Sequence, residues 1–222
     1  MATYKQGIDG PVMGKIGQHV GSKWRNIYYL RSLASAVSNP RTLKQRKVRA
    51  RFSTLVKLAS VFKSAFDTGF AKNSLSGVMT QGNIFVRKNW ECVTATSPDD
   101  VSVDYSSLMV ADGNLTGVVF GAVDYGEAHH LTISATFNGN VGADGADAND
   151  DVYLFAYCPD MGMSVLSTPA KRSTGSVSLT VPNLWDGQEV YLYGFTAAGD
   201  SNMRYIAGTC SKSSYCGTGE VQ

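Results

Sequence analysis

The spacing of the apolar residues changes near residue 98, and this change constrains the fold more than any other feature of the sequence. Between Val48 and Phe70, apolar residues recur at steps of three and four, which is the period of a helix with one buried face. After TSPDD, residues 96–100, short runs alternate apolar and polar residues, as half-buried strands do. We therefore expect an α+β chain in which helices precede a β domain.

The expected helix carries one continuous apolar stripe. Asn39 suits an N-cap and Pro40 the first helical position, because proline presets the helical φ angle. Arg46 and Lys57 are predicted opposite the stripe, at 100° per residue. A second helix is expected at about 77–90. The residues of the stripe are Val48, Phe52, Leu55, Ala59, Phe62, Phe66 and Phe70.

Before the helix, MGKIGQHVGSKWRNIYYLRS (residues 13–32) alternates small or polar residues with larger apolar ones. This pattern predicts a β-hairpin with its turn near Arg25 and Asn26. Two strands alone are marginal in water, so the hairpin must pack on something else.

The alternating runs after residue 98 predict an antiparallel, immunoglobulin-like β-sandwich, because short strands follow one another with turn residues between them. We therefore predict a basic hairpin-and-helix domain at 1–97, the sandwich at 98–213 and a tail at 214–222. The expected strands are 101–110, 116–122, 130–137, 152–157, 163–168, 176–181, 189–197 and 203–210.

The charges are divided unevenly along the chain. Residues 1–92 hold 16 bases and 3 acids, 16 − 3 = +13, whereas residues 93–222 hold 4 bases and 15 acids, 4 − 15 = −11. The densest basic segment is SNPRTLKQRKVRARF, residues 38–52, and we predict that it is an interaction surface for protein or phosphate. Its bases are Arg41, Lys44, Arg46, Lys47, Arg49 and Arg51.

Three interpretations of this basic segment stay open. The first is that it is a solvated helix face. The second is that it docks onto an acidic protein surface, such as the sandwich of a neighbouring copy, and the third is that it binds nucleic acid. Phosphate contacts would make the affinity sensitive to salt. No aromatic residues are interleaved for stacking on single strands, because Phe52, Phe62 and Phe66 belong to the apolar stripe.

The segments MATYKQGIDG, GKIGQHVGSKWRNIYYLRS, SNPRT and QRKVRARF together resemble the N-terminal signature of an uncharacterised family from Bacteroidota and their phages, domain of unknown function 6266. VDYSSLMVADGNLTG, DDVYLFAYCPDMG and GSVSLTVPNLWDGQEVYLYGF are similar to its C-terminal half. The resemblance implies a helical region followed by an immunoglobulin-like domain, and a virion component as a role to test. It brings no catalytic residues.

The residues themselves contain no recognisable catalytic or cofactor motif. His19 and the pair His129 and His130 lack a nucleophile and acid in a known arrangement. The acidic segment DGADANDD, residues 144–151, departs from the EF-hand calcium loop, because, counted from Asp147, Val152 and Cys158 occupy its glycine and glutamate positions. We expect no cofactor, no metal and no small-molecule substrate.

The cysteines have no zinc-ligand spacing, and only Cys210 and Cys216 could plausibly form a bridge, although reduced thiols are the expectation in the cytosol. The chain has no apolar run long enough to cross a membrane and no apolar N-terminal segment of the kind that directs secretion. We expect synthesis in the bacterial cytoplasm without a Sec signal, followed by incorporation into a virion.

These features predict a non-enzymatic structural protein that assembles into a symmetric homo-oligomer. A phage virion component is the role that we favour, as a ring, connector, tail or decoration protein in contact with other virion proteins. The alternative hypothesis is a nucleic-acid-binding accessory protein that uses the basic helix 41–63.

Overall fold

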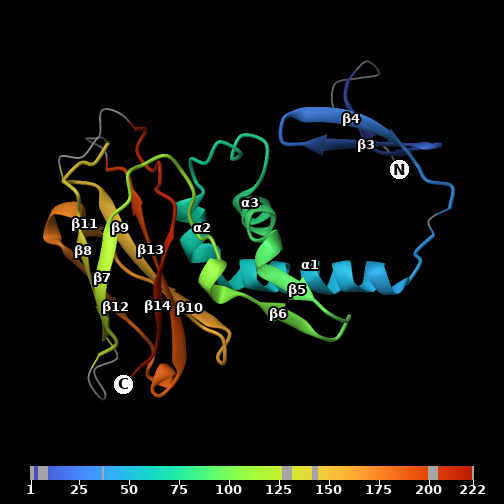
Figure 1. The fold of residues 1–222 in the computed structure, drawn as a ribbon. Helices are drawn as coiled ribbons and strands as arrows, with labels where there is room; N and C mark the ends of the chain where they lie inside the picture. The colour runs from blue at the N-terminus through green and yellow to red at the C-terminus, as the bar shows by residue number, and fades with distance from the viewer. Residues whose placement is uncertain are drawn as a thin grey trace. The chain divides into compact units, whose positions relative to one another are not determined.

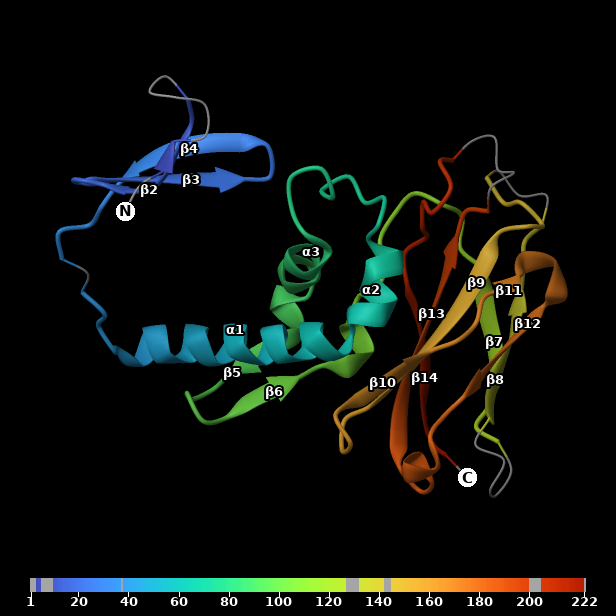
Figure 2. The ribbon, with the colours of Figure 1, turned by 180° about the vertical axis from the view of Figure 1, so that it is seen from behind.

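The structure, a computed structural model, describes residues 3–4, 10–36, 38–126, 132–141, 145–199 and 205–221. The chain divides into two compact units, Met1–Thr42 and Leu43–Gln222. Figures 1 and 2 show the ribbon from opposite sides.

The N-terminal unit is one antiparallel sheet in which each strand pairs with the next along the chain. The last two strands form the predicted hairpin, and Arg25 in its two-residue turn takes the left-handed conformation with φ of 52°. Gly21 has no room for a side chain, because a Cβ there would lie 2.1 Å from the carbonyl oxygen of Val12. The strands are β1 (Thr3–Tyr4), β2 (Val12–Ile16), β3 (His19–Trp24) and β4 (Ile27–Ser32).

This sheet leaves large apolar side chains uncovered. Every residue of β4 is exposed, and Ile27 keeps 66% of its surface accessible. Trp24 and Leu30 are exposed as well. The described residues of this unit therefore form a sheet without a core of its own.

The C-terminal unit begins with three helices, α1 (Leu43–Val61), α2 (Lys63–Gly69) and α3 (Gln81–Lys88). The sequence predicted one helix across residues 48–70, but the structure interrupts it at Phe62, which precedes α2. Helix α3 begins after Thr80, whose hydroxyl accepts a hydrogen bond from the Asn83 amide. Strands β5 (Val93–Ala95) and β6 (Val101–Val103) then form a hairpin that packs against α1.

The remaining strands form an antiparallel sandwich of two sheets. One sheet has the order β12-β8-β7, and the other has the order β10-β9-β13-β14, with β11 also paired to β9. Strands β8 and β12 are adjacent in one sheet although β9 and β10 of the other sheet lie between them along the chain, as in immunoglobulin-like folds. Their bounds are β7 (Val119–Asp124), β8 (Thr132–Asn138), β9 (Asp151–Cys158), β10 (Met163–Leu166), β11 (Ala170–Lys171), β12 (Ser176–Thr180), β13 (Glu189–Ala197) and β14 (Ser214–Glu220).

Strands β9 and β13 contribute to two different hydrophobic cores. Val152 and Leu154 of β9 point between the two sheets, where Trp185 is fully buried. Phe155 of β9 and Tyr193 of β13 point to the opposite face and pack against the helices. The helical segment therefore shares its core with the outer face of the sandwich (Figure 1).

This shared core changes the expected division of the chain. The sequence placed a domain boundary between residues 97 and 98. In the structure, the first compact unit ends at Thr42 and the second begins at Leu43. The alternation of apolar and polar residues along β9 and β13 predicts one buried face for each strand. It could not show that the helices also bury the opposite face. Residues 214–220, expected in the tail, instead form β14 at a sheet edge. Residues 205–210, expected in the last strand, form no strand, and Cys210 makes only an isolated bridge to Ala197.

The predicted fold class is confirmed: the chain is α+β, with an N-terminal strand hairpin, helices and then an antiparallel sandwich. Among the described helices, none has the length and apolar character needed to span a bilayer.

Candidate protein-interaction surfaces

Five of the six bases predicted as an interaction site lie on α1, and Arg41 lies just before it. Helix α1 has six bases and no acid in all, because Lys57 also belongs to it. Lys44, Arg46 and Arg49 are exposed, and Lys47 is partly buried. We call residues 43–52 the basic half of α1. In Figures 1 and 2 this half lies at the end of α1 that is farther from the sandwich.

Arg51 has a structural role that separates it from the other bases. Its Nε atom donates a hydrogen bond to the carbonyl oxygen of Trp90 at 2.8 Å, and its guanidinium lies 4.4 Å from the centre of the Trp90 ring. It also forms an ion pair with Glu91 at 3.3 Å. Arg51 therefore joins α1 to the segment that follows α3, so its charge is already partly compensated.

The apolar stripe of α1 is buried only in its C-terminal half. Leu55 and Phe62 are fully buried, as predicted, but Val48 and Phe52 keep 54% and 52% of their surface exposed. Phe52 instead borders an open groove of about 560 Å³, whose other apolar walls are Met79, Val86 and Trp90.

A second surface lies on the outer face of the sandwich, beside the shared core. We define the tyrosine patch as Tyr105, Tyr191 and Tyr215 with Glu189 and Glu220. The ring centre of Tyr105 lies 4.8 Å from that of Tyr191, which lies 6.5 Å from that of Tyr215. All five residues are exposed or partly exposed.

Two carboxylates of the tyrosine patch face each other across β13 and β14. Glu189 and Glu220 are directly opposite in the register of these strands, and both are exposed. Glu189 accepts hydrogen bonds from the hydroxyls of Thr218, at 3.2 Å, and Tyr191, at 3.5 Å. Like charges directly opposite on a sheet destabilise it, so this pair favours a cationic neighbour.

The electrostatics of the patch are consistent with its acidic character. Burial, with a smaller contribution from the Glu189 carboxylate, raises the pKa of Tyr191 and of Tyr215. Beside Tyr105, hydrogen bonds from the hydroxyls of Ser106 and Ser107 lower the pKa of Asp104. The phenols of Tyr191 and Tyr215 are therefore neutral near neutral pH.

Sequence reasoning did not identify this patch. Alternating tyrosines in EVYLYGF (residues 189–195) were an available signal, because residues 191 and 193 must share a face of a strand. Tyr215 and Glu220, however, were assigned to a tail. Their position became clear only when β14 paired with β13.

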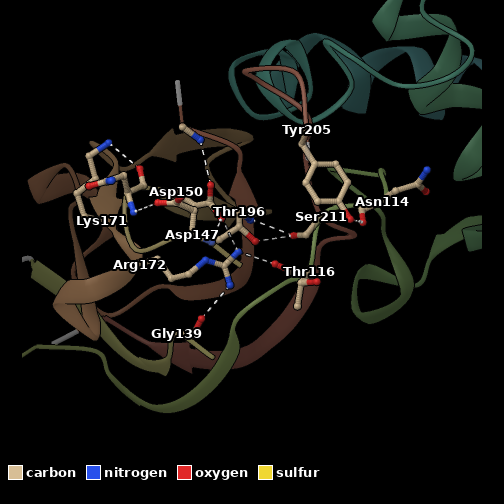
Figure 3. Close-up of polar contacts among 12 residues, drawn as sticks. Asn114, Thr116, Gly139, Asp147, Asp150, Lys171, Arg172, Thr196, Tyr205 and Ser211 are labelled. Carbon is tan, nitrogen blue, oxygen red and sulfur yellow. Dashed lines mark hydrogen bonds and ion pairs between the residues drawn. The ribbon is translucent and has the colours of Figure 1, made fainter. Parts of the chain in front are cut away.

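At the other end of the sandwich a buried ion pair connects several loops (Figure 3). The side chains of Arg172 and Asp150 are completely buried, with 3.1 Å between Arg172 Nη2 and Asp150 Oδ2. Arg172 also donates hydrogen bonds to the carbonyl oxygens of Gly139, at 2.9 Å, and Thr116, at 2.5 Å. Asp150 accepts hydrogen bonds from the backbone amides of Asp147 and Gly199. This network holds the loops together.

Two carboxylates of the acidic segment that was compared with a calcium loop form ion pairs within the sandwich. Asp150 pairs with Arg172, and Asp151 pairs with Lys171 at 2.6 Å. Asp144, His129 and His130 lie outside the described residues. Across the described part of the chain, no group of three or more potential ligands is placed to hold a metal ion.

The cysteines of the chain are all free thiols, including Cys210 and Cys216. Cys210 is buried, and its Sγ donates a hydrogen bond to the carbonyl oxygen of Thr68 at 3.3 Å. Burial raises the pKa of Cys210 to about 12.

The fold and these surfaces define a class of protein: an α+β chain that presents a basic, partly apolar helix and an acidic, tyrosine-rich sandwich face. The chain belongs to the family of unknown function DUF6266, whose model matches residues 10–208. No curated protein and no solved structure matches the chain.

Proposed function

We propose that this chain is a non-enzymatic structural protein that assembles into a symmetric homo-oligomer. The proposal includes its role as a ring, connector, tail or decoration component of a phage virion. The protein would be made in the bacterial cytoplasm and then incorporated with other virion proteins.

The observation that carries the proposal is that helix α1 and strand β4 both expose large apolar residues. Val48 and Phe52 on α1 and the whole of β4 are uncovered. Contiguous apolar surface of this kind is uncommon on monomeric proteins and marks sites of association. The arginines and tyrosines that surround these residues are also enriched at protein interfaces.

A second candidate function is nucleic-acid binding by the basic helix 41–63. The exposure of Lys44, Arg46 and Arg49 favours it, because lysine and arginine neutralise phosphates and release counterions. Contacts of this kind would be made to the backbone, without reading the sequence of bases.

Light scattering on the purified chain across a salt series, with and without duplex DNA, distinguishes the two functions. We expect a defined oligomer whose mass does not depend on DNA. A monomer at every concentration and salt would contradict the structural proposal. Binding of DNA to that monomer, weakening steeply with salt, would instead support the nucleic-acid function.

A further inference from the structure

The basic half of α1 and the tyrosine patch are complementary in charge and in side-chain chemistry. We propose that the basic half of α1 from one copy of this chain binds the tyrosine patch of a second copy. This inference rests on the proposed homo-oligomer and names the two surfaces that form its interface.

The tyrosine patch has the groups that bind cationic side chains. Glu189 and Glu220 would be relieved of their mutual repulsion by a lysine or arginine placed between them. The partly exposed faces of Tyr191 and Tyr215 add π systems that attract cations. The chain already uses this interaction elsewhere, since Arg51 lies over the ring of Trp90.

The basic half of α1 offers the matching groups in one row. Lys44, Val48 and Phe52 are spaced by four residues, so they lie along the same side of the helix. Lys47 is adjacent to this row, one turn before Arg51. An apolar row with bases beside it can contact tyrosine rings and carboxylates at the same time.

The net charge of α1 remains positive within its own protomer. The β5–β6 hairpin packs against α1 and carries Asp99 and Asp100 in its turn. Together with Glu91, which pairs with Arg51, these two carboxylates offset at most half of the six positive charges of the helix. A further acidic surface is therefore favourable for α1.

The geometry of α1 assigns that surface to another copy. The helix is continuous from Leu43 to Val61, and Phe62 packs against Tyr157 and Tyr193 of the sandwich. Lys47 precedes Phe62 by fifteen residues, which is roughly 22 Å along a helix axis. The basic half therefore extends away from the sandwich of its own chain. Contact between two different surfaces is either made twice in a two-fold dimer or repeats from copy to copy in a ring or a filament.

The N-terminal sheet is a weaker occupant for α1, although it also exposes apolar residues. Residues 10–42 contain Lys15, Lys23, Arg25, Arg31 and Arg41 and no acid. Placing this sheet on the basic half of α1 would bring like charges together. The tyrosine patch has the opposite charge and is the better partner.

Charge reversal on each surface tests the proposal. The first variant carries Lys44→Glu, Arg46→Glu and Lys47→Glu, and acids are favourable in the first turns of a helix, so α1 should remain folded. The second carries Glu189→Lys and Glu220→Lys. We expect each variant alone to assemble about 100-fold more weakly than the unmodified chain, as for truncated charge pairs at interfaces.

An equimolar mixture of the two variants should recover assembly. The acidic α1 of the first variant then meets the basic patch of the second, while the unmodified α1 of the second meets the unmodified patch of the first. Sedimentation velocity measures the assembly, and circular dichroism of each variant checks its fold. Lys57→Glu and Asp160→Lys are matched single reversals at exposed positions outside both surfaces and should assemble normally.

A second measurement detects the contact directly. A carbodiimide couples lysine amines to carboxylates that touch them, without a spacer. In oligomers mixed from ¹⁴N and ¹⁵N chains, we expect cross-linked peptides that join Lys44 or Lys47 to Glu189 or Glu220 with one light and one heavy partner. Cross-links confined to single chains would contradict the proposal.

The outcomes separate this inference from the function on which it rests. If the unmodified chain is monomeric at every concentration, both fail. If it assembles but either variant assembles equally well, or if the mixture does not recover, the inference is wrong and the structural function stands. If the first variant assembles normally but loses affinity for DNA, the basic half binds phosphate instead.

Discussion

The ring of Phe62, between α1 and α2, lies 4.8 Å from the ring of Tyr157 in β9, measured between centroids. Phe155 is two residues before Tyr157 in β9 and lies on the same face of that strand. Its ring centre is 4.9 Å from that of Phe62. One phenylalanine thus connects the helical segment with the outer face of the sandwich. The stability of these two parts should therefore be coupled.

We expect Phe62→Ala to lower the free energy of unfolding by about 3–5 kcal/mol, because it removes a fully buried ring from a tight aromatic cluster. Chemical denaturation followed by tryptophan fluorescence measures the change. Lys57→Ala, at an exposed position of α1, is the control and should change stability by less than about 0.5 kcal/mol. Equal effects of the two substitutions would mean that Phe62 is not buried.

A fragment that begins at residue 98 should not behave as an independent domain. It would expose Phe155, Tyr157, Tyr193 and Phe195, which the helices cover in the full chain. We expect residues 98–222 to bind hydrophobic dyes and aggregate, whereas residues 43–222 should unfold in one cooperative transition. A monomeric 98–222 fragment with the melting temperature of 43–222 would contradict this expectation.

Arg172→Met should destabilise the fold by about 3–5 kcal/mol, because it leaves the Asp150 carboxylate buried without its cation. Adding Asp150→Asn should restore part of the loss, and a double-mutant cycle in denaturant measures the coupling. Lys171→Met is the neighbouring control. Its ion pair with Asp151 is half exposed, so we expect a change below about 1 kcal/mol.

Arg51 and Arg46 should differ although both belong to the basic half of α1. Arg51→Gln removes the hydrogen bond and the cation–π contact with Trp90 and should cost about 1–2 kcal/mol. Arg46→Gln, at an exposed position, should leave the monomer within about 0.5 kcal/mol of the unmodified chain. Thermal unfolding of both variants compares them, and equal losses would contradict the structural role assigned to Arg51.

Cys210 should resist alkylation until the protein opens. Burial raises its pKa to about 12, so very little of the thiol is ionised at pH 8, and the thiolate is the reactive form. Iodoacetamide labelling followed by peptide mass spectrometry measures the rate at each cysteine. We expect denaturant to bring Cys210 to the rate of an ordinary thiol, and rapid labelling in the native state would contradict its burial.

Local features of the fold were predictable from the sequence. The turn at Arg25 and Asn26, the strand at 189–197 and the helical period around Leu55 all appear in the structure. These features depend on residues within a few positions of one another. Backbone preference and periodicity therefore determine them before any long-range contact forms.

Only the tertiary structure decided which surfaces are covered. Periodicity placed Phe52 and Phe62 on one stripe, but the sandwich reaches Phe62 and leaves Phe52 exposed. Likewise, no local pattern shows that Arg51 contacts Trp90, 39 residues later, or that Glu189 faces Glu220 across two strands. The physical reason is that a repeating pattern specifies which side chains share a face, whereas the packing of distant segments determines what lies against that face.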